Sequence, residues 1–137
     1  MDDLFVDTSG WATWCSSHER FHAVAVESVH RIWGRGGKLV TTSYVLAELT
    51  GLFNRIRIPR MNQFEIIDSL QRDPSVEIVQ IEPHWINSAW KLWHARPDKD
   101  WSLVDCASFV VMETRKITVA LTSDHHFEQA GFAPLLK

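Results

Sequence analysis

Short apolar runs alternate with longer segments of helical periodicity along all 137 residues of the chain. We predict buried strands over residues 3–7, 39–41, 76–81 and 117–121, and a last edge strand over 133–136. Strands that alternate with helices indicate an α/β fold with a mainly parallel sheet. We therefore expect a three-layer α/β/α sandwich that forms a single domain over residues 1–137.

Helical periodicity fills the segments between the predicted strands. We predict helices over residues 11–33 (broken near 15–18), 43–58, 62–72, 83–94, 102–115 and 127–130, with a loop over 96–100. Residues 8–10 are expected to turn the chain before the first helix. Asn62 and Glu65 have the spacing of a capping box and mark the start of the helix over 62–72.

Carboxylates interrupt or end these apolar runs. Asp7 and Asp124 follow predicted strands, whereas Glu48 and Asp105 lie early in helices, and Asp100 precedes Asp105. In a parallel sheet these positions can meet beyond the carboxyl ends of the strands. Carboxylates that are buried together repel each other unless a cation compensates their charge, and their hard oxygens suit Mg²⁺ or Mn²⁺. The sequence therefore predicts a metal site.

Each carboxylate also has an ordinary structural explanation, which stays open at this point. Asp7 can cap a helix or form an Asx turn, and Asp124 can be a turn residue. Asp105 can form a capping box with Ser102, a role compatible with metal binding, and Glu48 can be an ordinary residue at the border of a helix face.

Two histidines, His125 and His126, follow Asp124 directly. A metal that activates water makes a histidine base unnecessary. We therefore expect both histidines to be solvated turn residues rather than metal ligands.

Four stretches of the chain match one family pattern in order and in spacing. They are Phe5–Ser9, Ser43–Leu49, Asp98–Cys106 and Leu121–Phe127. On these stretches, which span essentially the whole chain, the sequence resembles the PIN-domain family and specifically its VapC-type ribonuclease toxins. The resemblance implies a PIN-like fold.

The resemblance also implies the residues of the site. The family's acidic quartet corresponds to Asp7, Glu48, Asp105 and Asp124, which would be catalytic and would hold Mg²⁺ or Mn²⁺. The supporting residues would be Asp100, Thr8, Ser9, Thr122 and Ser123.

The implied activity is metal-dependent hydrolysis of RNA phosphodiester bonds by the toxin of a type II toxin–antitoxin pair. The implied partners are an RNA substrate, a cognate antitoxin and a second copy of the chain in a homodimer. Two alternatives stay open: a PIN nuclease that processes RNA without an antitoxin, and a PIN-like scaffold that binds RNA or protein without cleaving. Single-stranded DNA also stays open as a substrate.

A net charge of −3 is no general signature of nucleic-acid binding, so RNA contact would depend on a local patch. Two groups of cations are candidates, Arg55 with Arg57 and Arg60, and Arg31 with Arg35 and Lys38. Either group can instead be a solvated face. Trp101 can stack on a base or pack its loop against the domain.

The remaining features favour a cytoplasmic protein that does not enter a membrane. The two cysteines, Cys15 and Cys106, lack a metal-binding spacing and fit a reducing compartment. The N-terminus lacks the pattern of a signal peptide, and no apolar run reaches the length of a membrane span.

Overall fold

The computed structural model describes residues 2–137, which form five strands and seven helices. The strands are β1 (Leu4–Val6), β2 (Leu39–Thr42), β3 (Val76–Val79), β4 (Val119–Leu121) and β5 (Ala133–Pro134). The helices are α1 (Thr8–Cys15), α2 (His22–Gly34), α3 (Ser43–Arg55), α4 (Arg60–Arg72), α5 (Pro83–Ala95), α6 (Leu103–Arg115) and α7 (His125–Gln129). Within this described part, no helix is both long and apolar enough to cross a membrane.

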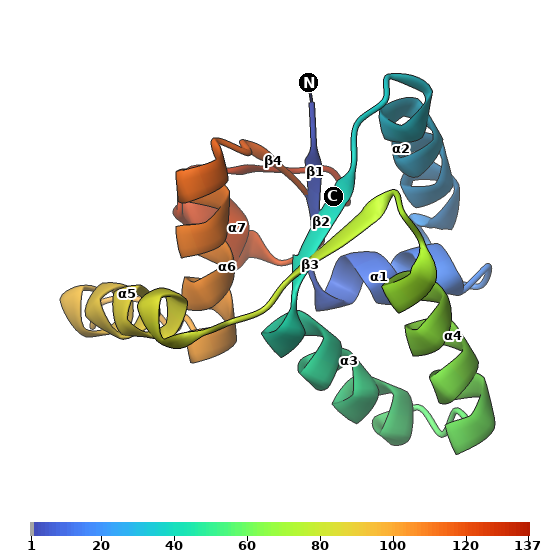
Figure 1. Cartoon of the computed structure of the whole chain (residues 1–137), viewed down its shortest axis with the longest axis horizontal. Coiled ribbons are helices and arrows are strands. Elements are labelled where there is room, and N and C mark those ends of the chain that lie inside the picture. The colour runs from blue at the N-terminus through green and yellow to red at the C-terminus, as the bar shows by residue number, and fades with distance from the viewer. Residues whose placement is uncertain (1) are drawn as a thin grey trace.

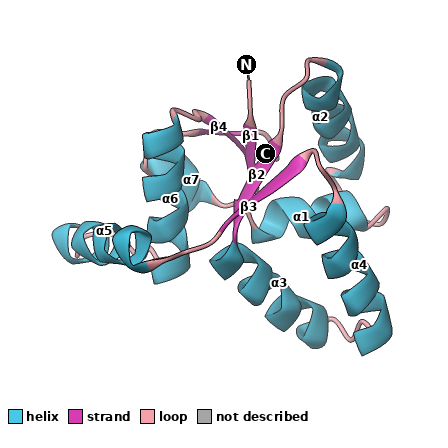
Figure 2. Ribbon diagram, in the orientation of Figure 1, coloured by secondary structure: helices cyan, strands magenta, loops and turns pink. Residues whose placement is uncertain are grey.

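The strands form one sheet in the order β3-β2-β1-β4-β5, and every pair of neighbours is parallel (Figure 2). In the centre of the sheet, Phe5 of β1 pairs with Val40 of β2 on one side and with Ala120 of β4 on the other. The carboxyl ends of these strands therefore lie at the same edge. The predicted parallel α/β fold is confirmed.

Helices cover both faces of the sheet (Figure 1). Helices α1, α2 and α4 lie on one side, and α6 and α7 lie on the other with α5 outside α6, while α3 extends beyond the carboxyl end of β2. The core contains the fully buried Phe5, Trp11, Phe53 and Phe127. This packing fixes the helices that begin at the carboxyl edge of the sheet.

Two local expectations from the sequence are wrong. Thr8, Ser9 and Gly10 form the first turn of α1 instead of a separate turn, because the Asp7 side chain caps that helix. The helix α4 begins at Arg60, and its N-cap Pro59 makes no side-chain capping bond. The expected capping box of Asn62 and Glu65 therefore lies inside the helix. The predicted break near residues 15–18 is confirmed by the separation of α1 from α2.

Candidate metal centre

A cleft of about 310 Å³ lies where the carboxyl ends of β1, β2 and β4 meet the helices that follow them. Five carboxylates line it: Asp7, Glu48, Asp100, Asp105 and Asp124. Thr8, Ser9, Ser102 and His126 also contribute to its wall. The fold thus brings together the acidic residues predicted from the sequence, although they are distributed over more than a hundred positions of the chain.

Asp7 is the most buried of these carboxylates, with 7% of its surface exposed. Its Oδ1 accepts hydrogen bonds from the Gly10 backbone N–H and the Ser9 hydroxyl, both at 2.8 Å, and its Oδ2 accepts one from Thr122 at 2.6 Å. Burial nevertheless raises the pKa of Asp7 to about 7, because these bonds offset only part of the cost of removing the charge from water.

Asp105 is held at the start of α6 by a capping box. The Ser102 hydroxyl accepts from the Asp105 backbone N–H, and the Asp105 carboxylate accepts from the Ser102 backbone N–H, each at 3.0 Å. This is the structural alternative considered from the sequence, and it leaves the carboxylate in the cleft. Burial raises the pKa of Asp105, and the neighbouring Asp124 carboxylate raises it further.

Asp124 and Glu48 complete the acidic group. Asp124 is the N-cap of α7, and its Oδ1 accepts from the His126 backbone N–H at 2.9 Å. Glu48 lies on the exposed side of α3, where its Oε1 accepts a hydrogen bond from the Thr8 hydroxyl. The capping roles considered from the sequence for Asp7 and Asp105 are therefore real, and Asp124, considered there as a turn residue, is also a helix cap. All three carboxylates line one cleft.

The other supporting residues lie at different depths. Thr122 is fully buried, and its hydroxyl donates to Asp7 while accepting from the Asp124 backbone N–H at 2.9 Å. Ser123 is exposed, and only its backbone N–H reaches the site, through a 3.0 Å bond to the Ser9 hydroxyl. Thr122 therefore links the Asp7 carboxylate to the backbone of Asp124, whereas Ser123 contributes through its backbone.

The expectation that both histidines are solvated is wrong for His126. Its side chain is 18% exposed, and its Nδ1 lies 3.1 Å from Asp105 Oδ2 and 3.3 Å from Asp124 Oδ1. His125 fits the expectation, with 73% of its side chain exposed. No sequence signal separates the two histidines, because only the direction of the first turn of α7 decides which ring enters the cleft.

The chemistry of this cleft fits a divalent cation. Among the described residues, its lining includes five carboxylates and one imidazole but neither lysine nor arginine. Burial raises the pKa values of Asp7 and Asp105, and repulsion from the Asp124 carboxylate raises both further. Hard oxygen ligands of this kind suit Mg²⁺ or Mn²⁺, and a bound cation would hold the carboxylates ionised.

Similarity to known proteins shows the family of this chain. Residues 4–133 match the family described as "PIN domain". The chain belongs to the PIN-domain family. It is 31% identical to the 23S rRNA-specific endonuclease VapC20 of Mycobacterium tuberculosis, in both strain CDC 1551 / Oshkosh and strain H37Rv, over 94% of this chain and 95% of that protein.

A solved structure gives the same result for the fold of this PIN domain. The crystal structure of Mycobacterium tuberculosis VapC20, described as a sarcin-ricin loop cleaving toxin, superimposes with a TM-score of 0.82 at 26% sequence identity. The match covers 98% of this chain and 100% of that one. The two folds therefore correspond over essentially their full length.

The predicted RNA-binding residues of this PIN domain have different surroundings. Arg55, Arg57 and Arg60 are exposed around the turn between α3 and α4. Arg55 follows Glu48 by two helical turns on the same face of α3, about 10 Å along the helix axis. Its guanidinium Nη1 would lie 3.8 Å from a Cβ placed on Gly51, so the side chain folds back along α3 toward the cleft.

The suggestion that Trp101 stacks on a base is wrong for this structure. Its ring is 6% exposed and packs edge-on against Phe109 with a centroid separation of 5.0 Å. Its Nε1 donates to Gln129 at 3.0 Å. The alternative considered from the sequence holds, because Trp101 fastens the loop that carries Asp100 to α6 and α7.

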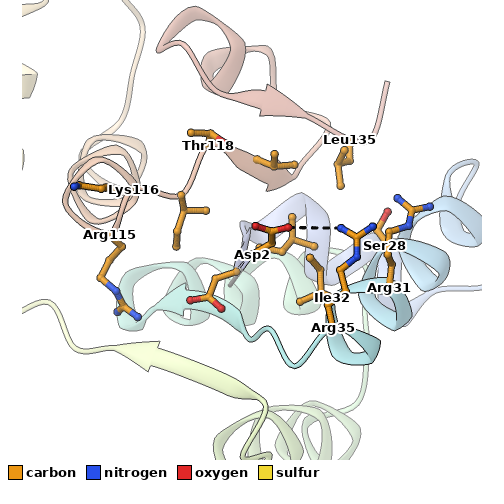
Figure 3. A pocket seen from close by; sticks show the side chains of 13 residues that line it. Asp2, Ser28, Arg31, Ile32, Arg35, Arg115, Lys116, Thr118 and Leu135 are labelled. Atoms are coloured by element: carbon orange, nitrogen blue, oxygen red, sulfur yellow. Dashed lines mark ion pairs between the residues drawn. The ribbon is translucent and has the colours of Figure 1, made fainter.

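A second cavity, of about 340 Å³, lies at the opposite edge of the sheet, where β1 and β4 begin (Figure 3). Arg31, Arg35 and Arg115 line it, and each pairs with a carboxylate: Glu27 at 2.7 Å, Asp2 at 3.6 Å and Glu77 at 2.7 Å. The group of Arg31, Arg35 and Lys38 therefore does not flank the acidic cleft.

Proposed function

We propose that this PIN domain is a divalent-metal-dependent endoribonuclease and the toxin of a type II toxin–antitoxin pair. The observation that carries the proposal is the convergence of Asp7, Asp105 and Asp124, with Glu48 at the rim, in a cleft whose described lining has no lysine or arginine. The similarity to an RNA-specific endonuclease over 94% of the chain supports the same activity.

Asp7, Asp105 and Asp124 would hold the cation, with Glu48 on its exposed side. Such a cation, Mg²⁺ or Mn²⁺, lowers the pKa of a bound water so that hydroxide is present near neutral pH. The protein's own contribution is to fix the carboxylates. Ser9, Gly10 and Thr122 hold Asp7, the α6 capping box holds Asp105, and the first turn of α7 holds Asp124.

The substrate in this proposal is a structured loop of ribosomal RNA. The relatives named above are described as a 23S rRNA-specific endonuclease and a sarcin-ricin loop cleaving toxin. Arg55, with Arg57 and Arg60 beyond it, would contact phosphates on the α3 side of the cleft. A net charge of −3 limits RNA binding to such a local patch.

The proposal includes a cognate antitoxin that blocks the acidic cleft, and a cytoplasmic site of action where ribosomal RNA is present. The expected homodimer stays a prediction. The apolar residues of segments 11–33 and 43–58 include Trp11, Val29, Leu49 and Phe53, which are buried in the core and not available to a partner. Trp90 and Trp93 of α5 are exposed, so they are better candidates than these buried residues for a contact between two copies. Light scattering measures self-association.

The test is cleavage of a sarcin-ricin hairpin and of a hairpin with the same stem and a scrambled loop. We expect the purified chain to cut the first RNA with Mg²⁺ or Mn²⁺, and to lose at least about a hundredfold in rate with EDTA or in Asp105→Asn. Cleavage that survives both treatments would contradict a carboxylate-held metal. Growth arrest on expression, relieved by the product of an adjacent gene, would support the toxin role.

The second candidate is a PIN nuclease that processes RNA without an antitoxin. The same acidic cleft favours it, since the chemistry is identical. Cleavage of RNA in vitro without growth arrest on expression of the folded protein would favour this candidate over the toxin.

A further inference from the structure

His126 occupies a position in the cleft that the acidic quartet does not explain. Its Nδ1 lies between two carboxylates, 3.1 Å from Asp105 Oδ2 and 3.3 Å from Asp124 Oδ1. The ring is largely buried, with 18% of the side chain exposed. A surface histidine in a mobile turn would not contact two carboxylates from different elements of the fold.

The fold fixes this ring from two sides. The His126 backbone N–H donates to Asp124 Oδ1 at 2.9 Å, which sets the direction of the first turn of α7. The next residue, Phe127, is 1% exposed and packs edge-on against Phe109 of α6 at 4.9 Å between ring centroids. This anchor holds α7 against α6, so the imidazole is preorganised next to Asp105.

The two distances from Nδ1, of which the shorter is a hydrogen bond to Asp105, also match the spacing of ligands that share one ion. Adjacent ligands of an octahedral cation with bonds of about 2.1 Å are about 3.0 Å apart, close to the two distances from Nδ1. The neighbouring His125 differs. Its Nδ1 is 3.8 Å from Asp124 Oδ1, and its side chain is 73% exposed. Ligand atoms of Asp124, His125 and His126 all lie within 4.8 Å of one another, but of the two histidines His126 is the one that also contacts Asp105 and lies largely inside the cleft.

We propose that His126 is a nitrogen ligand of the divalent cation in this cleft, binding through Nδ1 beside Asp105 and Asp124, and that it makes the site prefer Mn²⁺ to Mg²⁺. This inference rests on the proposed metal dependence and extends the ligand set beyond the carboxylates. Imidazole nitrogen binds first-row transition metals well, whereas Mg²⁺ prefers oxygen ligands. The Nε2 atom would carry the ring proton when Nδ1 binds the metal.

Pulsed electron paramagnetic resonance of the full chain with one equivalent of Mn²⁺ tests the proposal, because a directly bound nitrogen couples to the unpaired electrons. The variants are His126→Phe, which keeps a ring of similar size without nitrogen, and His125→Phe as a matched control. We expect the nitrogen coupling in the unmodified chain and in His125→Phe, and its loss in His126→Phe. Titration calorimetry should show Mn²⁺ affinity about tenfold or more weaker in His126→Phe, with Mg²⁺ affinity little changed.

The unmodified chain decides the question even if a variant fails to fold. Mn²⁺ bound without nitrogen coupling would overturn the proposal, and so would a coupling lost in His125→Phe but kept in His126→Phe. The proposed function fails separately. Nitrogen coupling without RNA cleavage would support His126 as a ligand and contradict the proposed nuclease activity. RNA cleavage without nitrogen coupling would support the nuclease activity and contradict His126 as a ligand.

Discussion

At the scale of single residues, three carboxylates of the candidate metal centre also serve the fold as helix caps. Asp7 caps α1, Asp105 caps α6 and Asp124 caps α7. A carboxylate at a helix N-terminus is stabilised by the exposed N–H groups of the first turn. Three such caps aimed into one cleft therefore produce an acidic site without unsatisfied carboxylates, although the burial of Asp7 still opposes its ionisation.

The first prediction concerns Asp7, whose pKa is raised from 3.8 to about 7 in the folded protein. Between these values the unfolded chain releases the proton and the folded chain keeps it, so the metal-free protein loses stability as pH rises through that window. At about 1.4 kcal/mol per unit, the loss is on the order of 4 kcal/mol. We expect Asp7→Asn to remove this pH dependence and to be more stable than the unmodified chain at pH above about 7.

Urea unfolding in EDTA, repeated across this pH window, measures the effect. Asp98→Asn is a suitable control, because Asp98 pairs with Arg96 on the surface at 3.0 Å, away from the core. Parallel pH profiles for Asp7→Asn and the unmodified chain would contradict the assignment of a buried, protonated Asp7.

At the scale of elements, the close approach of α1 to β4 builds the cleft. A Cβ on Gly10 would lie 2.0 Å from the carbonyl oxygen of Leu121, so only glycine permits this crossing. The contact brings the start of α1 against the end of β4, and Thr122 can then donate to Asp7 across the two elements. Glycine inside a helix reduces its stability, and here the packing of the site requires it.

We therefore predict that Gly10→Ala separates α1 from β4. Overpacking of this kind costs about 1–3 kcal/mol, and the added methyl here meets rigid backbone. Metal binding should weaken as well, because Asp7 and Thr122 move apart. Gly51→Ala in α3 is the matched control, since its new methyl would meet only Arg55 Nη1 at 3.8 Å. Thermal unfolding and metal titration of both variants test this, and equal behaviour would exclude a special role for the crossing.

At the scale of the whole molecule, the two edges of the sheet differ in charge. The carboxyl edge carries the acidic cleft, and the amino edge carries arginines that pair with carboxylates. A cation bound at the first edge would relieve repulsion between the carboxylates at the starts of α1, α6 and α7, so it would link elements on both faces of the sheet.

This linkage predicts that a divalent metal stabilises the folded protein. At a metal concentration of about 100 times the dissociation constant, the expected gain is about 2.7 kcal/mol. Thermal unfolding at pH 7.5 with and without Mn²⁺ measures it, and Asp105→Asn should abolish most of the gain. A melting temperature that does not respond to Mn²⁺ or Mg²⁺ in the unmodified chain would contradict the metal centre.

The position of Arg55 gives a further prediction at this scale. It lies on the same face of α3 as Glu48, whereas Arg31 lies at the opposite edge of the sheet and pairs with Glu27. We expect Arg55→Gln to weaken RNA binding. The slope of log affinity against log salt concentration should fall by about 1, the change expected for the loss of one phosphate contact. Arg31→Gln should leave both unchanged. Equal effects of the two variants would place the RNA elsewhere.

Much of the fold follows from patterns within a few residues of one another. The strands and the break between α1 and α2 appear in the order and near the places predicted, because apolar periodicity and turn residues act locally. The start of α4 was predicted wrongly, since Asn62 and Glu65 have the local spacing of a capping box but the chain turns at Pro59. Local spacing cannot show which of two competing starts the tertiary packing selects.

The sequence by itself determined the parallel α/β class and predicted the carboxylates that line the cleft, because both depend on residue type and on position relative to strands and helices. Tertiary structure alone decided which of the other candidate side chains share the cleft with these carboxylates. His126 enters it and His125 does not, Trp101 is buried and not available to RNA, and Arg31 and Arg35 lie at the wrong edge. The physical reason is that contacts between distant elements depend on how helices pack on the sheet, and neighbouring residues with the same chemistry differ only in that packing.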